Sequence, residues 1–565
     1  MSTHLASGAA RGRARIFGLA AVTAMVTCAV VSGPQVSAGM NGPVRIDSGL
    51  VQGVPARDPT IIVFKGIPYA APPVGNLRWR PPQAAPHWSG VREADRFGPI
   101  CPQPQDRSGQ PMSEDCLSLN VWTPASSADA RLPVMVWIHG GGFFAGSGSE
   151  RVIDGTGLAR KGVIVVTLNY RLGVLGFLAT PQLSGESPHH SSGDDGLLDE
   201  IAALKWVRRN IAAFGGDPDN VTIFGHSAGA GSVNFLSISP LAQGLFRRGL
   251  AESQVRWPQD LELRYLSSSW RSLATAEKEG EEYLDRLGVH SLKNLRALPW
   301  QRLLQRTNEP DLDVYTGSTA KPPIFRPDID GWVLPRDYSQ TFAARAQNQV
   351  EYAAGNNLDE GGARPPSSWA WLRSHPPRSD VNLGSPIPIV TLAAYRRAAW
   401  RKFGRNAPEF FKLYPAATDD QAAREENLAI HDNSQISTYL WARQWEVETG
   451  QPVYTYFWTH APPEPDRRLR GAYHGSERYY VFDSLADFDF PWTAQDRRIA
   501  DIMSSYWANY ARTGNPNGPG LPHWPVFDPK ARTVMVLGNR FASVPIARGA
   551  KFRFWTRFFA MHKAW

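Results

Sequence analysis

Apolar residues gather in short runs between residues 117 and 224, and these runs predict strands. The runs occupy Leu117–Trp122, Pro133–Ile138, Gly162–Asn169 and Val221–Phe224. The second and third are almost continuously apolar, which is typical of strands covered on both faces of a parallel sheet. Between the third and fourth runs, Gly196–Phe214 has apolar residues at helical spacing and ends at a Gly-Gly-Asp-Pro turn. This alternation predicts an α/β fold with a mostly parallel central sheet flanked by helices.

Weaker patterns extend the prediction to the rest of the chain. They indicate a β-hairpin at residues 44–54, an irregular segment at Phe64–Pro82, a strand at Val350–Ala354 and a terminal helix at Phe552–Trp565. Residues 255–345 and 364–445 are more helical and polar, which indicates cap insertions over one end of the sheet. Since no linker or internal repeat interrupts the chain, residues 39–565 are predicted to form a single α/β domain.

The N-terminus has the pattern of a cleavable signal peptide. Arg11, Arg13 and Arg15 precede a mostly apolar stretch, Ile16–Val31, and the small residues Val36–Ala38 follow it. A membrane anchor is the alternative, but sixteen residues fall short of the about 20 that a spanning helix needs. We therefore expect residues 1–38 to be a signal peptide cleaved after Ala38, export to the periplasm or the medium, and no stable membrane insertion.

Composition and charge are those of an ordinary globular protein. Hydrophobic residues make up 42% of the chain and charged residues 20%, and the formal net charge is +8. Because the signal peptide carries three of these positive charges, the mature chain keeps five, too few to indicate nucleic-acid binding.

The cysteines fit an exported protein. Cys28 would leave with the signal peptide, whereas Cys101 and Cys116 lie close together in a loop-rich stretch. In an oxidising compartment this pair predicts one disulfide closing a small loop, with two free thiols as the alternative. No further Cys or His lies between these two cysteines, so we expect no metal site and no cofactor.

Candidate chemistry begins at Gly225–Gly229, a G-x-S-x-G sequence between a predicted strand and a possible helix. Strand, G-x-S-x-G and helix form the context of a nucleophile elbow, which makes Ser227 the candidate nucleophile. His139–Phe143, with three glycines in a row, directly follows the strand Pro133–Ile138. Such a loop exposes backbone N–H groups, so we expect the oxyanion hole to use Gly141, Gly142 and Ala228.

A base and an acid should follow the serine in the chain. His474 lies between small residues in a loop and is the candidate base. The segment after Val350–Ala354 offers Asp359 or Glu360 as the acid. Spacing alone does not choose between these two carboxylates.

These motifs resemble the type-B carboxylesterase and cholinesterase family of α/β-hydrolases. The matching stretches are Gly66–Ala70, Ser113–Trp122, Asn169–Gly173, Phe214–Gly229 and Arg512–Asn517. The resemblance spans nearly the whole mature chain and implies an α/β-hydrolase fold with Glu360 as the acid that orients His474. It also implies a Cys101–Cys116 disulfide.

The resemblance makes further structural assignments. It implies ion pairs between Arg78 and Glu114 and between Arg171 and Asp199. It further implies that Ser253 forms a hydrogen bond near the triad acid.

The chain also departs from the family pattern. His226 replaces the Glu that often precedes the nucleophile, and Asp194 and Glu200 replace amides. The cysteine loop is short and has no Trp, which argues against a cholinesterase.

The favoured function is a serine esterase that cleaves small-molecule carboxylic esters through an acyl-enzyme. A lipase, an amidase or a carbamate hydrolase is the nearest alternative, since the same triad serves all of them. A non-catalytic binding or adhesion protein is an alternative of another class, although it would be expected to have lost the serine or the histidine. Arg364, Arg373 and Arg378 could favour acidic esters at the site entrance, but a solvated loop is the favoured interpretation.

Overall fold

The computed structural model describes residues 40, 42–104, 109–264, 269–305, 307, 309–318, 320–361, 390–465 and 467–565. All of these residues belong to one compact unit. The predicted signal peptide and Arg364, Arg373 and Arg378 lie outside the described residues.

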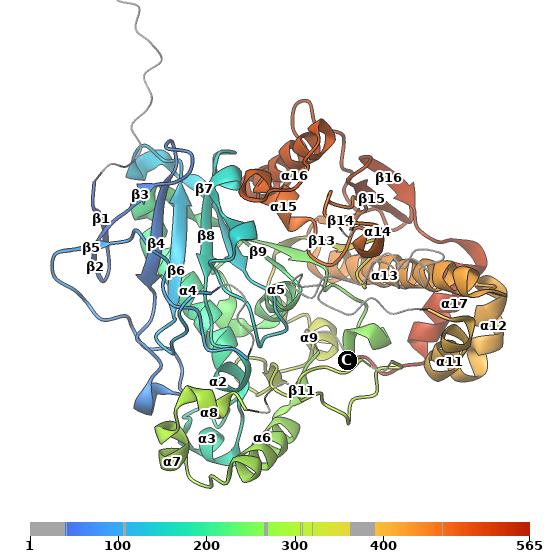
Figure 1. Cartoon of the computed structure of the whole chain (residues 1–565), viewed down its shortest axis with the longest axis horizontal. Helices are drawn as coiled ribbons and strands as arrows, with labels where there is room; N and C mark the ends of the chain where they lie inside the picture. The colour runs from blue at the N-terminus through green and yellow to red at the C-terminus, as the bar shows by residue number, and fades with distance from the viewer. Residues whose placement is uncertain are drawn as a thin grey trace, which may run out of the picture. The chain divides into compact units, whose positions relative to one another are not determined.

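An eleven-stranded sheet forms the centre of this unit, in the order β16-β15-β14-β13-β10-β9-β7-β8-β6-β4-β3 (Figure 1). Neighbouring strands pair in parallel from β8 to β15, whereas both edges are antiparallel. The strands are β3 (Val54–Pro55), β4 (Ile62–Pro68), β6 (Ser118–Thr123), β7 (Leu132–Ile138), β8 (Ile164–Leu168), β9 (Gly216–His226), β10 (Arg248–Glu252), β13 (Glu351–Asn357), β14 (Val453–Trp458), β15 (Thr533–Leu537) and β16 (Ala542–Pro545). The predicted mostly parallel α/β sheet is confirmed.

Two hydrophobic cores cover the two faces of the sheet. On β7, Val134 and Val136 point into one core, and Met135 and Trp137 point into the other. Because successive side chains of a strand point to opposite faces, a strand between two cores must be apolar at every position. This explains the continuous apolar run that predicted β7.

Helices flank both faces of the sheet. The first core includes residues of α4, α5, α13 and α17, and the second includes residues of α1, α15 and α16. The helices are α1 (Thr156–Ala159), α2 (Gly173–Phe177), α3 (Pro181–Glu186), α4 (Asp195–Asn210), α5 (Ala228–Ile238), α6 (Leu273–Leu287), α7 (Leu292–Ala297), α8 (Trp300–Leu303), α9 (Tyr338–Ala343), α11 (Leu392–Phe403), α12 (Ala407–Leu413), α13 (Asp419–Thr449), α14 (Arg467–Arg470), α15 (Arg478–Val481), α16 (Ala494–Thr513) and α17 (Gly549–Ala560).

Most of the helices in the predicted insertions stand apart from the sheet. In Figure 1, α6, α7 and α8 lie together at the bottom of the view, and α11 and α12 lie together at the right beside α17. They occupy the ranges predicted to be helical and polar. The terminal helix α17 was also predicted, although it starts at Gly549 and ends at Ala560. Among the described residues, no helix is long and apolar enough to cross a membrane.

The prediction of an irregular segment at Phe64–Pro82 is wrong at its start. Strand β4 covers Ile62–Pro68 and pairs with β6, with a shift of register between Phe64 and Ile67. Gly66 lies in this shift with a φ of 67°. A bulge of this kind interrupts the alternation of apolar and polar positions, which hid the strand in the sequence.

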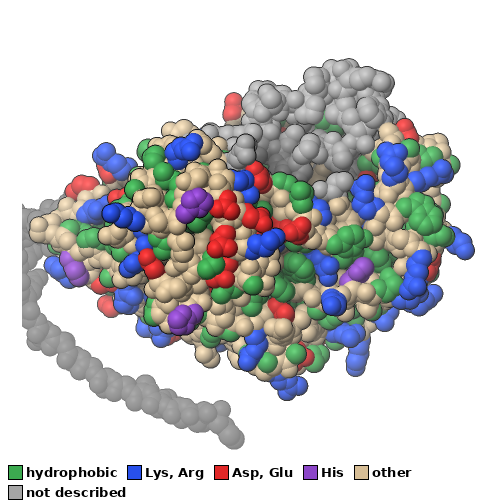
Figure 2. All heavy atoms as spheres, turned by 90° about the horizontal axis from the view of Figure 1, so that it is seen from below, with side chains coloured by type: hydrophobic (Ala, Val, Ile, Leu, Met, Phe, Trp, Pro, Cys, Tyr) green, Lys and Arg blue, Asp and Glu red, His purple; other side chains and the backbone are tan. Residues whose placement is uncertain are grey.

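Small sheets complete the fold. The predicted hairpin consists of β1 (Val44–Ile46) and β2 (Gly49–Gln52), which pair antiparallel, and β5 (Val91–Glu93) adds a third strand. Strands β11 (Arg271–Ser272) and β12 (Asp328–Ile329) form a separate parallel pair. On the described part of the face in Figure 2, basic side chains are spread over the surface, and acidic side chains gather near the middle.

Candidate active site

Ser227 occupies a sharp turn between β9 and α5. Its φ of 58° and ψ of −124° lie in a region that residues other than glycine rarely adopt. The two flanking positions must be glycine, because a Cβ at either one would overlap neighbouring backbone atoms. A Cβ added to Gly225 would lie 2.6 Å from the carbonyl carbon of Gly229, and one added to Gly229 would lie 2.0 Å from the oxygen of Ile138. The G-x-S-x-G sequence therefore forms the elbow that its context predicted.

The glycine-rich loop after β7 lies against this turn. A Cβ added to Gly140 would be 3.0 Å from Cβ of Ser227. Gly141 and Gly142 have φ values of 110° and 66°, and the N–H of Ala145 donates to the oxygen of Gly141 at 3.0 Å. Within the described residues, no hydrogen bond uses the N–H of Gly141, Gly142 or Ala228. The loop thus offers free backbone donors beside the serine.

The acid and the histidine meet through their side chains. His474 Nδ1 lies 2.6 Å from Glu360 Oε2, and the other oxygen of Glu360 accepts the N–H of Asn357 at 2.8 Å. Burial raises the pKa of Glu360, but the charge and hydrogen bond of His474 and the Asn357 N–H outweigh it, so the pKa lies below its ordinary value. Glu360 is therefore suited to remain a carboxylate and to orient the imidazole.

Asp359, the alternative acid, has a different contact. It accepts the N–H of Ala472 at 2.8 Å, and its own N–H donates to the oxygen of Ala472 at 3.1 Å. Asn357 Nδ2 adds a bond of 2.7 Å to the oxygen of Tyr473. These bonds join the segment that carries the acid to the loop that carries His474.

His474 also packs against the residue next to the serine. The rings of His226 and His474 lie 4.2 Å apart, and a Cβ added to Gly475 would be 2.9 Å from Cε1 of His226. Burial, together with the charges of His474 and Arg478, holds the pKa of His226 well below its ordinary value. The structure contains no direct hydrogen bond between the Ser227 hydroxyl and His474, both of which are described residues.

Two buried carboxylates lie behind this site and escaped sequence analysis. Glu252 accepts a hydrogen bond of 2.8 Å from Trp507, and Glu477 accepts one from Asn357. Burial raises the pKa of Glu477 to about 7 and that of Glu252 well above its ordinary value. The sequence offered one signal for each: Glu252 ends the strand that follows the nucleophile, and Glu477 lies three residues after His474.

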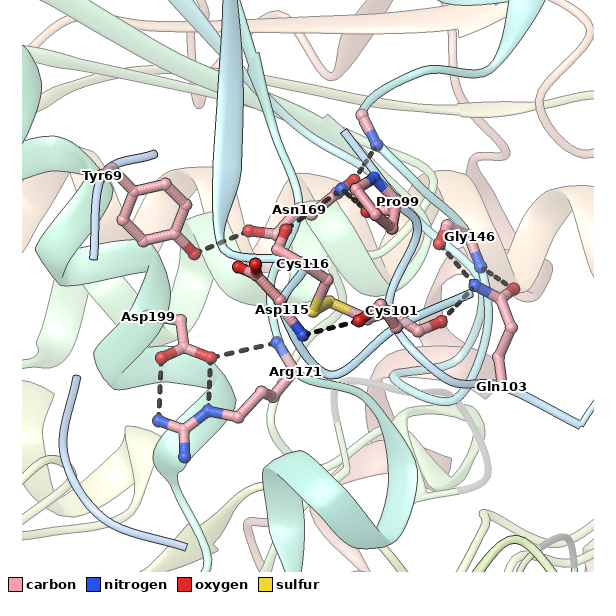
Figure 3. Close-up of a disulfide and its surroundings, with 12 residues drawn as sticks. Tyr69, Pro99, Cys101, Gln103, Asp115, Cys116, Gly146, Asn169, Arg171 and Asp199 are labelled. Carbon is pink, nitrogen blue, oxygen red and sulfur yellow. Dashed lines mark hydrogen bonds and ion pairs between the residues drawn. A yellow bond between two sulfur atoms is a disulfide. The ribbon is translucent and has the colours of Figure 1, made fainter. Parts of the chain in front are cut away.

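Residues assigned through the resemblance have mixed outcomes. Both ion pairs are present, with Nε–carboxylate distances of 2.6 Å for Arg78–Glu114 and 2.8 Å for Arg171–Asp199. The Cys101–Cys116 disulfide is also present (Figure 3). Ser253 differs from the expectation. Its N–H donates to Gly355, but its buried hydroxyl has no hydrogen-bond partner among the described residues.

Possible metal ligands do not cluster in the part of the chain that the structure describes. It contains no group of three or more His, Cys, Asp or Glu side chains arranged to hold a metal ion.

Comparison with known proteins gives consistent matches. The model of the carboxylesterase family matches residues 41–555. The fumonisin B1 esterase of Sphingopyxis macrogoltabida is 35% identical over 515 residues, covering 88% of this chain and 86% of the relative. Carboxylesterase 1F of Mus musculus is 32% identical over 566 residues, covering 95% and 96%. Among solved structures, a PNB esterase has a TM-score of 0.70 and 31% identity, covering 91% of this chain and all of its own.

Proposed function

The chain belongs to the carboxylesterase family and is a carboxylic ester hydrolase, and on this basis we propose that Ser227, His474 and Glu360 carry out the hydrolysis. The observation that carries the proposal is the bonded pair of Glu360 and His474, whose loop packs beside the strained Ser227 turn. Ser227 is the nucleophile, His474 the base and Glu360 the residue that stabilises the imidazolium.

The first half of the reaction forms an acyl-enzyme. His474 takes the proton of the Ser227 hydroxyl as its oxygen attacks the ester carbonyl carbon. The carbonyl oxygen becomes an oxyanion, which accepts hydrogen bonds from the N–H groups of Gly141, Gly142 and Ala228. When the intermediate collapses, the bond to the alcohol oxygen breaks and His474 gives its proton to the leaving alcohol.

The second half repeats these steps with water. His474 deprotonates a water molecule, which attacks the acyl carbonyl, and the same N–H groups hold the second oxyanion. Collapse breaks the bond to Ser227, returns the proton to its oxygen and releases the carboxylic acid. Both halves use one base, so losing His474 should block acylation and deacylation alike.

We propose a small-molecule ester as the substrate. The relatives are named as carboxylesterases and as a fumonisin B1 esterase, which supports ester rather than amide or carbamate cleavage. A panel of short p-nitrophenyl esters, long-chain triglycerides and anilides separates these substrate classes. Turnover is expected for the short esters, and a preference for triglycerides or anilides would favour the lipase or amidase alternative.

Ser227→Ala tests the assignment of the nucleophile. Because the attacking oxygen is removed, kcat on a p-nitrophenyl ester should fall by at least about 10⁴-fold. A fluorophosphonate probe should add one adduct to the wild-type protein, on the peptide containing Ser227, and none to the variant. Ser505→Ala is a suitable control on α16. Retention of full activity by Ser227→Ala would refute the proposed mechanism.

A further inference from the structure

Gln103, in the loop closed by the disulfide, forms hydrogen bonds with the backbone at the end of the glycine-rich loop that follows β7. Gln103 lies two residues after Cys101 and is buried. Its Nε2 donates to the oxygen of Gly146 at 3.0 Å and to the oxygen of Cys101 at 3.0 Å, while its Oε1 accepts the N–H of Gly146 at 2.9 Å (Figure 3). One carboxamide therefore satisfies both backbone groups of Gly146 and ties them to the disulfide.

At Gly146 the backbone that follows the glycine-rich loop packs back against the start of that loop. Its φ is 107°, and an added Cβ would lie 2.4 Å from the oxygen of Gly140. A Cβ added to Gly141 would lie 2.0 Å from the oxygen of Ala145. Because these backbone segments touch, a shift of residues 145–146 must also move residues 140–141.

The other hydrogen bonds that join this loop to the rest of the fold lie at other positions along it. The hydroxyl of Tyr170 donates to the oxygen of His139 at 3.0 Å, and the N–H of Gly173 donates to the oxygen of Phe143 at 2.6 Å. Gly148 is held by Asn169, whose Nδ2 also donates to the oxygen of Cys116. Gln103 thus fixes the backbone of Gly146, which packs against Gly140, the residue just before the expected oxyanion donors.

We propose that Gln103 is a positioning residue for ester hydrolysis, which fixes Gly146 and thereby holds the N–H groups of Gly141 and Gly142 where the oxyanion forms. The inference rests on the proposed function of these donors. A preorganised donor stabilises the transition state because it does not have to be reoriented during the reaction. A displacement of about 1 Å at a reacting centre can reduce the rate by about 100-fold.

Gln103→Met tests this role because it keeps the volume of the side chain and removes all three hydrogen bonds. We expect kcat on a p-nitrophenyl ester to fall by about 10 to 100-fold, with KM changed by less than about threefold. The inhibition constant of an aryl trifluoromethyl ketone, which becomes an oxyanion when Ser227 adds to it, should rise by a similar factor. Loose packing alone would not weaken this inhibitor in parallel with kcat.

Gln110→Met is the matched control. Gln110 lies in the same disulfide-closed loop, and its amide bonds to Ser149, beyond the glycine-rich segment. Its kcat and inhibition constant should stay within about twofold of wild type. Equal behaviour of the two variants would overturn the role of Gln103 while leaving the proposed function intact, whereas an active Ser227→Ala would defeat the proposed function itself. If Gln103→Met does not fold, Gln103→Glu keeps the length and the acceptor, and a kcat equal to wild type would overturn the proposal.

Discussion

At the scale of single residues, two neighbouring carboxylates have separate tasks. Glu360 contacts the imidazole of His474, and Asp359 accepts the backbone N–H of Ala472. Adjacent residues in a loop point in different directions, so the loop conformation decides which one reaches the histidine. Sequence spacing predicted the segment but could not choose between them.

Replacement by amides separates these two tasks. Glu360→Gln should lower kcat by about 10³ to 10⁴-fold, because a neutral amide cannot stabilise the imidazolium of His474. Asp359→Asn keeps an oxygen that can accept the Ala472 N–H, so its kcat should stay within about threefold of wild type. Steady-state hydrolysis of a p-nitrophenyl ester measures both variants, and the reverse order of losses would assign Asp359 as the acid.

Asp194 is a buried carboxylate where the family pattern has an amide. Its Oδ2 and both carboxylate oxygens of Asp328 have no hydrogen-bond partner among the described residues. Burial and the charge of Asp328 raise the pKa of Asp194 well above its ordinary value. The folded protein therefore keeps a proton that the unfolded chain releases near pH 4, and the resulting stabilisation is lost as pH rises through the folded-state pKa.

Asp194→Asn should remove this loss. We expect the free energy of unfolding to increase by about 1 to 3 kcal/mol at pH 8, with a smaller gain at pH 5, because the loss of stability linked to a raised pKa grows as pH rises above the ordinary pKa. Urea unfolding at both values of pH measures the difference. Asp496→Asn is a control of opposite sign. Burial raises the pKa of Asp496, but hydrogen bonds from Thr493 and His460 outweigh it and hold the pKa below its ordinary value, so loss of this carboxylate should lower the free energy of unfolding at pH 8. A loss of stability in Asp194→Asn at pH 8 would contradict the argument.

At the scale of elements, strands between two cores were the easiest to predict. For β7 and β8, burial on both faces requires an unbroken apolar sequence, and the predicted and observed bounds differ by at most two residues. Strand β4 was missed because its bulge at Gly66 breaks the pattern. The hydrogen bonds between Gln103 and Gly146 join residues 43 positions apart. Such a pairing depends on the tertiary fold and could not be predicted from the sequence.

The disulfide loop is the element whose stability can be tested most directly. Cys101 and Cys116 are separated by 15 residues, and closing a loop of this size stabilises a protein by about 3 kcal/mol in the chain-entropy model. The Cys101→Ser/Cys116→Ser double variant should therefore lose about 3 kcal/mol in free energy of unfolding, measured with urea. Reduced wild-type protein serves as the comparison and should match the variant. An unchanged unfolding free energy would show that the cross-link contributes little.

At the scale of the whole molecule, export is the prediction to test. We propose that residues 1–38 are removed, and the Cys101–Cys116 disulfide supports an oxidising destination. Expression of the full chain with its own N-terminus should give a mature protein that begins at Gly39. Intact mass and N-terminal sequencing of the periplasmic and medium fractions measure the cleavage. Ala38→Leu should impair processing, and an uncleaved wild-type chain would contradict the prediction.

The strained backbone of Ser227 lowers the stability of the folded enzyme at the position proposed to carry its activity. Glycine adopts φ and ψ angles of this kind freely, whereas serine holds them at a cost of about 1 to 3 kcal/mol. Laboratory evolution toward heat resistance alone would therefore favour Ser227→Gly, a change that removes the nucleophile of the proposed mechanism. A selection scheme for hardier variants must demand product formation in every round, or the population will drift toward well-folded but inert descendants.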